Sequence, residues 1–295
     1  MTDVPFELVT IKNAALSAAI NAFGAELTHF RDAAGRELMT NADPAFWAGR
    51  APLLFPVVGA VNGDVIRVDG AAYPMRKHGF ARHSAFEIIA HQPDRAVFRL
   101  ADSAETRAAY PFAFVLEIEF AIEGATLSMT ATITNPGDVP LPASFGFHPA
   151  FAWPLPYGMP REGHRIMFGS HEAATIAKLG ADGTVASEAR ETPLDGRSLR
   201  LRDALFDDDA LIWPTVNSSR VTYGAPGAPV LDIDFAGSPS LGIWTKPGAA
   251  FVCIEPWHGI ADPQGYAGEF SDKPGVFTVP PGGAQDCAMR VTLAA

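Results

Sequence analysis

Apolar and polar residues alternate with a period of two along most of this chain. The segments that do so are LSAAINAF (16–23), AFEIIA (85–90), AVFRLA (96–101), FVLEIEFAI (114–122), ATLSMTATITN (125–135), PVLDIDFA (229–236), GVFTVP (275–280) and CAMRVTLA (287–294). Because successive side chains of a strand point to opposite faces, this alternation predicts half-buried β-strands. Only DPAFWAGR (43–50) predicts a short helix, with Asp43 as its N-cap and Pro44 at the first helical position.

Glycine and proline divide the alternating segments into short strands. The chain has 27 glycines and 25 prolines, and the EGA sequence around Gly124 joins two of the strongest segments, which predicts a hairpin turn. The fold class is therefore all-β, with antiparallel sheets packed face to face. No change in composition marks a domain boundary, so residues 1–295 are interpreted as a single domain, with 155–205 as a polar surface excursion.

Two strand ends present groups that can transfer protons. In SFGFHPAF (144–151), alternation places His148 on the face opposite Phe145 and Phe147, and the proline that follows holds it in an extended conformation. In FVCIEPW (251–257), Glu255 shares a face with Phe251 and again precedes a proline. A carboxylate in an otherwise apolar strand is rarely buried without a partner or a purpose. We expect the histidine and the glutamate to face each other across a substrate as acid and base.

A third motif, RKHGFARHSAF (76–86), adds His78 and Arg82 on either side of Gly79, where glycine permits a tight turn or a close approach of the backbone to a ligand. Arg82 could instead pair with a carboxylate at the edge of the core. Trp257 could belong to the core or form an aromatic platform for a sugar. Four other histidines lie in polar surroundings and are predicted to be surface residues: His83, His91, His164 and His171.

Composition and spacing narrow the function classes. The formal net charge of −11 argues against a general nucleic-acid binder, and no segment has the length and apolarity of a membrane span. Cys253 and Cys287 show no C-x-x-C spacing and are interpreted as buried free thiols. With no secretory signal visible, a cytoplasmic location is expected. His78, His148 and Glu255 are too dispersed for their spacing to support a metal site, and no G-x-S-x-G elbow is present.

The motifs together resemble those of the aldose 1-epimerase family, the galactose mutarotase-like proteins, and the similarity is greatest to the LacX-like branch. The resemblance covers nearly the whole chain and rests on the order of RAPLLFP (50–56), HGFAR (78–82), GFHPAF (146–151), FVCIEPW (251–257) and DKPGVFTVPPGG (272–283). It implies a large antiparallel β-sandwich that binds a small-molecule sugar in a groove across one sheet. It also implies interconversion of the α and β anomers of a free aldose, without a metal or cofactor.

The resemblance implies roles for individual residues. Glu255 matches the general base that removes the proton from the C1 hydroxyl, and His148 matches the general acid that protonates the ring oxygen. His78 matches a second histidine that binds and polarises the sugar, and Arg50 and Arg82 match substrate-side positions. To act as acid the histidine must be protonated, which a nearby carboxylate would favour.

The chain departs from the family pattern at one position. Many relatives carry an arginine after the glycine of the Phe-Pro-x-x-Gly segment, whereas Ala60 follows Gly59 here, so Arg67 or Arg82 could supply the missing contact. Members also place an aspartate against the sugar hydroxyls. The sequence offers Asp207, Asp208 and Asp209, of which we favour Asp209 because it directly precedes the apolar segment ALIW.

Three alternatives to a free-hexose mutarotase stay open at this point. A hexose 6-phosphate mutarotase would hold the phosphate with Arg50, Arg82 or Lys246, since arginine binds phosphate in bidentate geometry. A non-catalytic sugar-binding or sensing protein could share the fold, although such a protein has no need for an acid–base pair. A cupin-like metal enzyme is the remaining class. The oligomeric state leaves no signal in the sequence.

Overall fold

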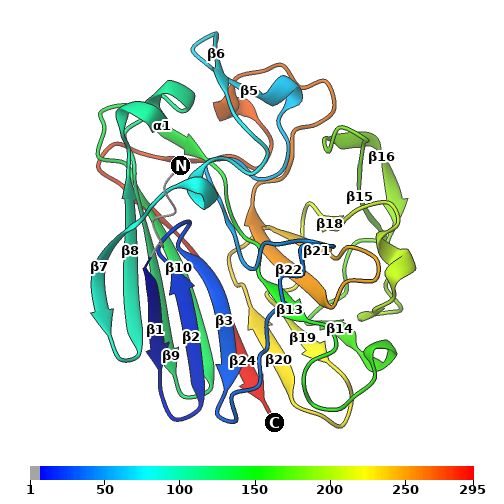
Figure 1. Ribbon diagram of the computed structural model, residues 1–295. Coiled ribbons are helices and arrows are strands. Elements are labelled where there is room, and N and C mark those ends of the chain that lie inside the picture. Colours follow the sequence, from blue (N-terminus) through cyan, green and yellow to red (C-terminus); the bar gives the residue numbers. More distant parts are fainter. Residues whose placement is uncertain (1–6) are drawn as a thin grey trace.

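The computed structural model describes residues 7–295, and antiparallel strands make up most of it (Figure 1). The alternating segments all form strands, as predicted. β9 and β10, for instance, bury every second residue along their length, and the turn between them contains Gly124 with a positive φ of 56°. Two large sheets contain the majority of the strands, and the remaining strands form three small sheets.

The larger sheet has nine strands, which follow one another in space as β17 (Ser198–Arg200), β14 (Arg165–Phe168), β19 (Arg220–Gly224), β20 (Val230–Asp234), β24 (Ala284–Ala294), β10 (Thr126–Thr134), β9 (Val115–Glu123), β8 (Arg95–Ala101) and β7 (Glu87–Gln92). The second sheet follows the order β16 (Val185–Glu191), β15 (Thr175–Leu179), β18 (Leu211–Trp213), β21 (Ser240–Trp244), β22 (Phe251–His258), β12 (Phe145–Phe147) and β4 (Leu53–Leu54), with β13 (Ala150–Ala152) also paired to β22.

The three small sheets are β1 (Leu8–Lys12), β2 (Leu16–Asn21) and β3 (Glu26–Asp32); β5 (Val65–Val68) and β6 (Ala71–Pro74); and β11 (Leu141–Ala143) and β23 (Phe277–Val279). The helical elements are α1 (Ala104–Ala109) and the 3₁₀ turns η1 (Asn62–Asp64), η2 (Ala81–His83), η3 (Arg161–Gly163), η4 (Asp203–Phe206) and η5 (Phe270–Asp272). In the described part of the chain no helix has the length and apolarity to cross a membrane.

The facing sides of the two large sheets share one apolar core. Phe120 of β9 and Met289 of β24 belong to the same buried cluster as Phe145 of β12, Leu241 of β21 and Ile254 of β22. Each such side chain contributes about 1.5–3 kcal/mol by burial, so residues of both sheets hold the sandwich together. The opposite face of the second sheet is left free to form a site.

The segment 155–205, predicted to be a surface excursion, belongs to both sheets instead. It supplies β14 and β17 to one edge of the nine-stranded sheet, and β15 and β16 to the edge of the other. Buried Ile166, Phe168 and Leu199 anchor the first pair. The strands are short, and β16 is exposed along most of its length, so their alternation is weak in the sequence.

Two smaller predictions were also wrong. DPAFWAGR forms a turn and not a helix, because the Asp43 carbonyl accepts hydrogen bonds from the N–H groups of Phe46 and Trp47 and no further helical bonds follow. His164 is buried, with Nε2 accepting from the Leu155 N–H at 3.0 Å. The prediction for the cysteines is confirmed, since Cys253 and Cys287 are both buried and free.

Candidate active site

The strand β22 carries two sets of side chains on opposite faces. Val252 and Ile254 enter the shared core, whereas Cys253, Glu255 and Trp257 point to the other side. This is the arrangement that alternation predicted for FVCIEPW. All seven residues from 251 to 257 are buried, so the outward-facing groups lie beneath further structure and not on an open surface.

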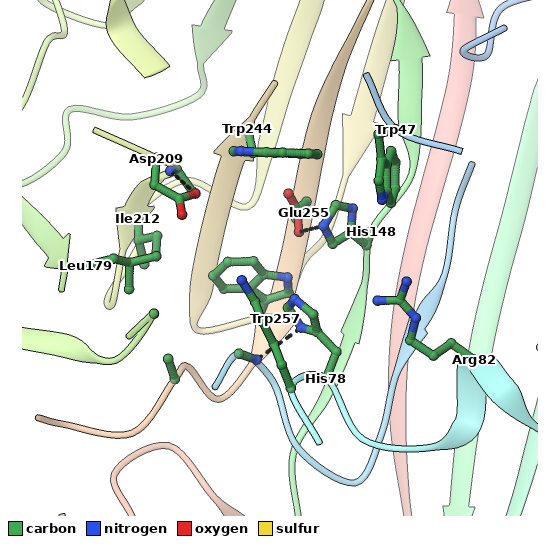
Figure 2. A pocket seen from close by; sticks show the side chains of 15 residues that line it. Trp47, His78, Arg82, His148, Leu179, Asp209, Ile212, Trp244, Glu255 and Trp257 are labelled. Atoms are coloured by element: carbon green, nitrogen blue, oxygen red, sulfur yellow. Dashed lines mark hydrogen bonds and ion pairs between the residues drawn. The ribbon is translucent and has the colours of Figure 1, made fainter. Parts of the chain in front are cut away.

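Two glycines make room for the Trp257 indole on this face. A Cβ added to Gly146 of β12 would lie 2.5 Å from the ring, and one added to Gly242 of β21 would clash with it as well. Glycine is therefore the one residue that fits at both positions, because any side chain there would occupy the space of the indole. As a result, the ring packs over the neighbouring strands and forms one wall of a cavity (Figure 2).

The cavity has a volume of about 280 Å³ and lies over the middle of the second sheet (Figure 2). Its lining combines aromatic, charged and small residues from several loops and strands: Trp47, Gly59, Lys77, His78, Arg82, His148, Leu179, Gly183, Asp209, Ala210, Ile212, Trp244, Glu255, Trp257 and Ala261. The volume is close to the lower end of the range for small-molecule sites, about 300 Å³. Such a cavity suits a ligand of the size of a single sugar ring.

His148 and Glu255 meet at the wall of this cavity. Nε2 of the imidazole lies 3.1 Å from Oε2 of the carboxyl group, and the side chains are only 10% and 2% exposed. The two groups thus touch directly, whereas the sequence suggested that they face each other across a substrate. Within residues 7–295, Nδ1 of His148 and Oε2 of Glu255 have no hydrogen-bond partner. Buried polar atoms are seldom left in this condition, and such atoms are available to a ligand.

Burial controls the charge of this pair. It lowers the pKa of His148 to about 3, and the positive charges of Arg82 and Lys77 act in the same direction. Burial also raises the pKa of Glu255 well above its ordinary value, with a further contribution from the negative charge of Asp209. The expectation that the carboxylate would keep the histidine protonated is therefore wrong, because desolvating two charges costs more than their attraction returns. The pair favours its uncharged form, with the proton on Glu255.

His78 is held in a fixed orientation by its own loop. Its φ of 67° is uncommon for a residue other than glycine, and its backbone N–H donates to the Gly59 carbonyl at 2.9 Å. In return, the Gly59 N–H donates to Nδ1 of the imidazole at 3.1 Å. Burial lowers the pKa of His78 well below its usual range. A neutral ring that accepts at Nδ1 carries its hydrogen on Nε2, which leaves a donor for the cavity.

Gly79 serves a purpose other than contact with a ligand. Its φ is 71°, and a Cβ at this position would clash with the backbone carbonyl of Phe55. The close approach suggested by the sequence is therefore made to the chain itself. This contact between Gly79 and Phe55 holds the HGFAR loop, which carries His78 and Arg82, against the segment that follows β4.

The predicted cationic residues separate into two groups. Arg82 lines the cavity, as does Lys77, which the sequence analysis did not single out. Arg50 does not line it: its Nη1 donates to the carbonyls of Thr28 and Thr40, so the guanidinium connects β3 to the segment around Thr40. A sugar contact is accordingly no longer expected for Arg50.

Two other cationic candidates lie elsewhere. Lys246 donates to the Phe46 carbonyl at 3.2 Å on the exposed rim and is absent from the lining of the cavity, as is Arg67. Of the two replacements considered for the arginine missing at Ala60, only Arg82 therefore reaches the cavity.

Among the three candidate aspartates, Asp209 lies in the lining of the cavity. Its backbone has a φ of 71°, and Oδ1 accepts the Ala210 N–H at 2.7 Å. This bond turns the carboxylate toward the cavity at the start of β18 (Figure 2). Asp207 and Asp208 are exposed and border an adjoining surface hollow instead. Contact between Asp209 and a substrate stays a prediction.

Sequence reasoning missed two aromatic walls. Trp47 lies 5.1 Å from His148 between ring centroids, and Trp244 packs edge-on against Trp47 at 5.6 Å. Trp47 lies in the segment predicted as a helix that does not form, and the SLGIW segment of Trp244 carried no motif that drew attention to it. Neither position had a local signal, because what brings them together is the packing of distant loops against β22.

Comparisons with known proteins agree with this architecture. Residues 7–262 match the family model for aldose 1-epimerase. The chromosomal LacX protein of Lactococcus lactis subsp. lactis is 29% identical over 283 residues, which cover 92% of this chain and 95% of LacX. Among solved structures, a galactose mutarotase related enzyme from Lactobacillus acidophilus superimposes with a TM-score of 0.91 at 29% identity, over 98% of both chains.

A galactose mutarotase-like protein from Lactobacillus casei superimposes equally well, with a TM-score of 0.91 at 27% identity over 97% of this chain and all of the other. A galactose 1-epimerase from Lactobacillus acidophilus has a TM-score of 0.70 at 14% identity, a likeness that shows the common fold alone. The family match spans most of the chain and agrees with the all-β sandwich described above. This chain belongs to the aldose 1-epimerase family.

Proposed function

We propose that this protein is an aldose 1-epimerase that interconverts the α and β anomers of a free hexose. The observation that carries the proposal is the contact between His148 and Glu255 at 3.1 Å on the wall of a cavity sized for one sugar ring. Mutarotation moves protons on and off two oxygens, the C1 hydroxyl and the ring oxygen, and both are bonded to the same carbon. Two groups that exchange those protons must therefore lie side by side, as these do.

In the proposed reaction, the Glu255 carboxylate removes the proton from the C1 hydroxyl. The electrons of that O–H bond form the C1 carbonyl, the bond from C1 to the ring oxygen breaks, and the ring oxygen takes a proton from His148. Rotation about the C1–C2 bond then presents the other face of the carbonyl. Ring closure reverses both proton transfers, so no redox centre or nucleophile is required.

Both protonation forms of the pair take part in this cycle. With the ring open, Glu255 carries a proton and His148 is neutral, which is the form that burial favours. With the sugar ring closed, the imidazole of His148 carries the proton and Glu255 is a carboxylate. The two forms differ by a single proton moved between groups 3.1 Å apart, so the pair needs one proton in total throughout.

Other cavity residues are suited to hold the sugar. His78 presents an Nε2 donor, Arg82 adds a cation, and Asp209 offers a carboxylate to hydroxyl groups. The ring of Trp257 provides an apolar surface for the C–H face of a pyranose. These contacts would fix the anomeric carbon against His148 and Glu255 while the ring opens.

A second candidate substrate is a hexose 6-phosphate. The observation that favours it is the presence of two cations, Lys77 and Arg82, in the lining of one small cavity. Lysine and arginine are both effective partners of phosphate, and neither side chain has an ion-pair partner at 4.0 Å or less among the described residues. Of the three cations considered from the sequence, only Arg82 keeps a place in this alternative.

The test is the anomeric exchange rate measured by NMR saturation transfer with glucose, galactose and glucose 6-phosphate. We expect the wild type to accelerate exchange of at least one sugar, and Glu255→Gln to lower that acceleration at least about 100-fold. His258→Gln is the matched control, because His258 ends the same strand but does not line the cavity.

The result also separates the alternatives. A preference for glucose 6-phosphate that Lys77→Gln removes would select the phosphorylated substrate. Binding of a sugar without accelerated exchange would select a sugar-binding protein of the same fold. If Glu255→Gln exchanged anomers at the wild-type rate, the assignment of the acid–base pair would be wrong.

A further inference from the structure

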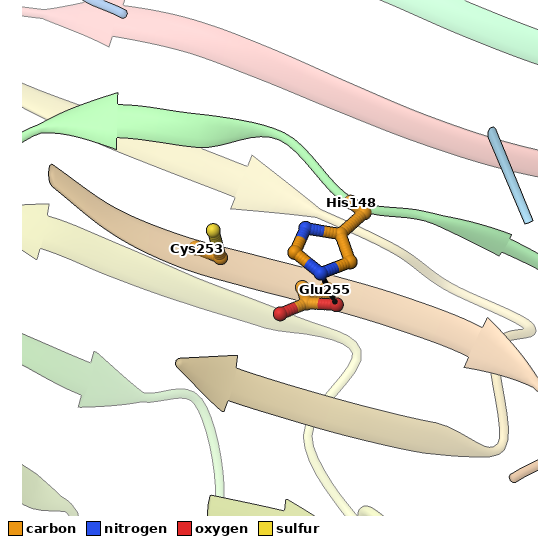
Figure 3. Close-up of side chains that lie close together, drawn as sticks. All are labelled: His148, Cys253 and Glu255. Carbon is orange, nitrogen blue, oxygen red and sulfur yellow. Dashed lines mark ion pairs between the residues drawn. The ribbon is translucent and has the colours of Figure 1, made fainter. Parts of the chain in front are cut away.

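A third potential metal ligand lies beside the acid–base pair. Cys253 is two residues before Glu255 on β22 and points to the same face, and the His148 ring lies over Glu255 with Cys253 to one side (Figure 3). One ligand atom from each residue can be chosen so that the three atoms all lie within 4.8 Å of one another. The mechanism proposed above uses His148 and Glu255 and gives the thiol no task.

We propose that His148, Cys253 and Glu255 form a site for a borderline-soft divalent cation such as Zn²⁺, and that the cation inhibits the enzyme. The inhibitory part rests on the proposed function, whereas the binding part does not. Zn²⁺ takes imidazole nitrogen, thiolate sulfur and carboxylate oxygen as ligands, and this cluster supplies one of each. A harder ion such as Mg²⁺ or Ca²⁺ would have little use for the sulfur.

The geometry requires only a small adjustment. Ligand bonds of about 2.0–2.3 Å at tetrahedral angles place ligand atoms roughly 3.5 Å apart. The 3.1 Å separation between His148 and Glu255 is already short enough, so the thiol side of the cluster must close by about 1 Å. Cys253 is buried beside the cavity and not in its lining, so this movement requires rotation of the His148 and Glu255 side chains toward the thiol.

The polar atoms of the cluster also lack the partners that a purely structural group would have. Oε2 of Glu255, the oxygen that lies 3.1 Å from Nε2 of His148, is buried without a hydrogen-bond partner among residues 7–295. Buried donors and acceptors are normally satisfied, and a bound ion is one of the ways in which such atoms are satisfied. Three protein ligands leave the fourth tetrahedral position facing the cavity, where water or a sugar hydroxyl would complete the site.

Binding would displace protons and stop catalysis. As the Zn–S bond forms, the Cys253 thiol releases its proton to solvent, and the Glu255 carboxyl group releases its own proton on coordination. The lone pairs that His148 and Glu255 use for proton transfer would then be engaged by the metal. The sugar could still enter, but neither its C1 hydroxyl nor its ring oxygen would find a free base or acid.

The decisive experiment uses Co²⁺ as a spectroscopic probe of the purified protein. Wild type titrated with Co²⁺ should develop a sulfur-to-metal charge-transfer band, and Cys253→Ala should lose it. Cys287→Ala is the matched control, since this other buried free thiol lies on β24 and should leave the band unchanged. Competition with Zn²⁺ should remove the band from the wild type.

The cobalt result decides the binding proposal whether or not the protein accelerates mutarotation. No band in the wild type, or an undiminished band in Cys253→Ala, would overturn it. In the exchange assay, Zn²⁺ should slow the wild type, a chelator should restore the rate, and Cys253→Ala should need at least about tenfold more Zn²⁺ for the same inhibition. Equal sensitivity of Cys253→Ala and wild type would overturn the inhibitory role.

Discussion

Two buried acid–base pairs in this molecule have the same separation but different surroundings. His148 and Glu255 are 3.1 Å apart at the cavity, and Lys273 and Asp262 are 3.1 Å apart in the loops that flank it, with side chains no more than 10% exposed in either pair. The second oxygen of Asp262 accepts hydrogen bonds from the Asn62 backbone at 2.9 Å and from its side-chain amide at 3.3 Å. Glu255 has no comparable support from the backbone.

The pair of Lys273 and Asp262, which these hydrogen bonds support, connects three parts of the cavity wall. The Asp262 N–H donates to the Ala60 carbonyl, and the Asp262 carbonyl accepts the Val185 N–H of β16. The next residue back, Ala261, packs against Gly59, which in turn contacts His78. A carboxylate with both oxygens engaged is suited to hold loops in place, whereas one without support from the backbone is suited to exchange protons. The comparison therefore distinguishes structural from chemical use of the same residue types.

The largest expected effect is a loss of activity when the pair of His148 and Glu255, which lacks support from the backbone, is changed. His148→Gln keeps a polar side chain of similar size but cannot donate a proton to the ring oxygen, so anomeric exchange should fall by about 10²–10⁴-fold. The free energy of unfolding should change by only about 1 kcal/mol, because the one polar contact of the imidazole that is lost is that of Nε2 with Glu255, and Nδ1 has no hydrogen-bond partner among the described residues. Exchange rates and chemical denaturation of the same preparation test both statements.

A substitution in the pair of Lys273 and Asp262 is expected to affect stability more than activity. Lys273→Met leaves the Asp262 carboxylate buried without its cation, which should lower the free energy of unfolding by about 3–5 kcal/mol. The double variant Asp262→Leu with Lys273→Met removes both charges and should recover part of that loss. Urea denaturation measures the difference, and equal stability of the single variant and the wild type would contradict the structural role.

The contrast between the two pairs also shows what the sequence could reveal. Alternation is local, so it was enough to predict the strands and to place His148 and Glu255 on defined faces. The expected position of Glu255 at a strand end was wrong, because β22 continues through Pro256 to His258. The contact between these residues is not local, because 106 positions separate them, and the sequence led us to expect a substrate between them. Lys273 and Asp262 were not singled out as a pair: Asp262 lies in no alternating segment or motif, and Lys273 lies in DKPGVFTVPPGG without a local sign of its partner.

Some failures have the same origin. Trp47 was placed in a helix because Asp43 and Pro44 fit a helix start, yet packing against distant aromatic residues decided its conformation. The charge state of His148 was misjudged because sequence neighbours do not reveal the depth of burial. Local pattern thus predicts elements and faces, whereas burial and contacts between loops decide protonation and the composition of the cavity.

The dependence of the free energy of unfolding on pH tests the charge state of His148 and Glu255. The unfolded chain binds a proton at His148 below about pH 6.5 and releases one from Glu255 above about pH 4.5, while the folded protein keeps the proton on Glu255 throughout. Between these values both states hold one proton, so the pair contributes no slope. Glu255→Gln leaves His148 alone, and stability should then fall as the pH drops from 6.5 toward 3, by up to about 1.4 kcal/mol per pH unit.

His148→Gln should show the opposite sign. Glu255 then titrates without compensation, so stability should fall as the pH rises above 4.5, since the unfolded chain releases a proton that the folded protein retains. Denaturation curves for wild type and both variants, recorded in the presence of a chelator, test the pair of slopes. Slopes reversed in sign in both variants would contradict the uncharged form of the folded pair.

The smallest expected effect comes from the two charges that act on Glu255 across the cavity. The negative charge of Asp209 raises the pKa of Glu255 and the positive charge of Lys77 lowers it, both as minor contributions beside burial.

The pair of His148 and Glu255 needs one proton, so activity should be lost at high pH when Glu255 releases this proton and His148 cannot take it up. Asp209→Asn should therefore move this alkaline limit to lower pH, and Lys77→Gln should move it to higher pH. The substitutions remove opposite charges from one cavity, so each is the control for the other. Limits that moved in the same direction would mean that a group other than Glu255 sets the alkaline limit.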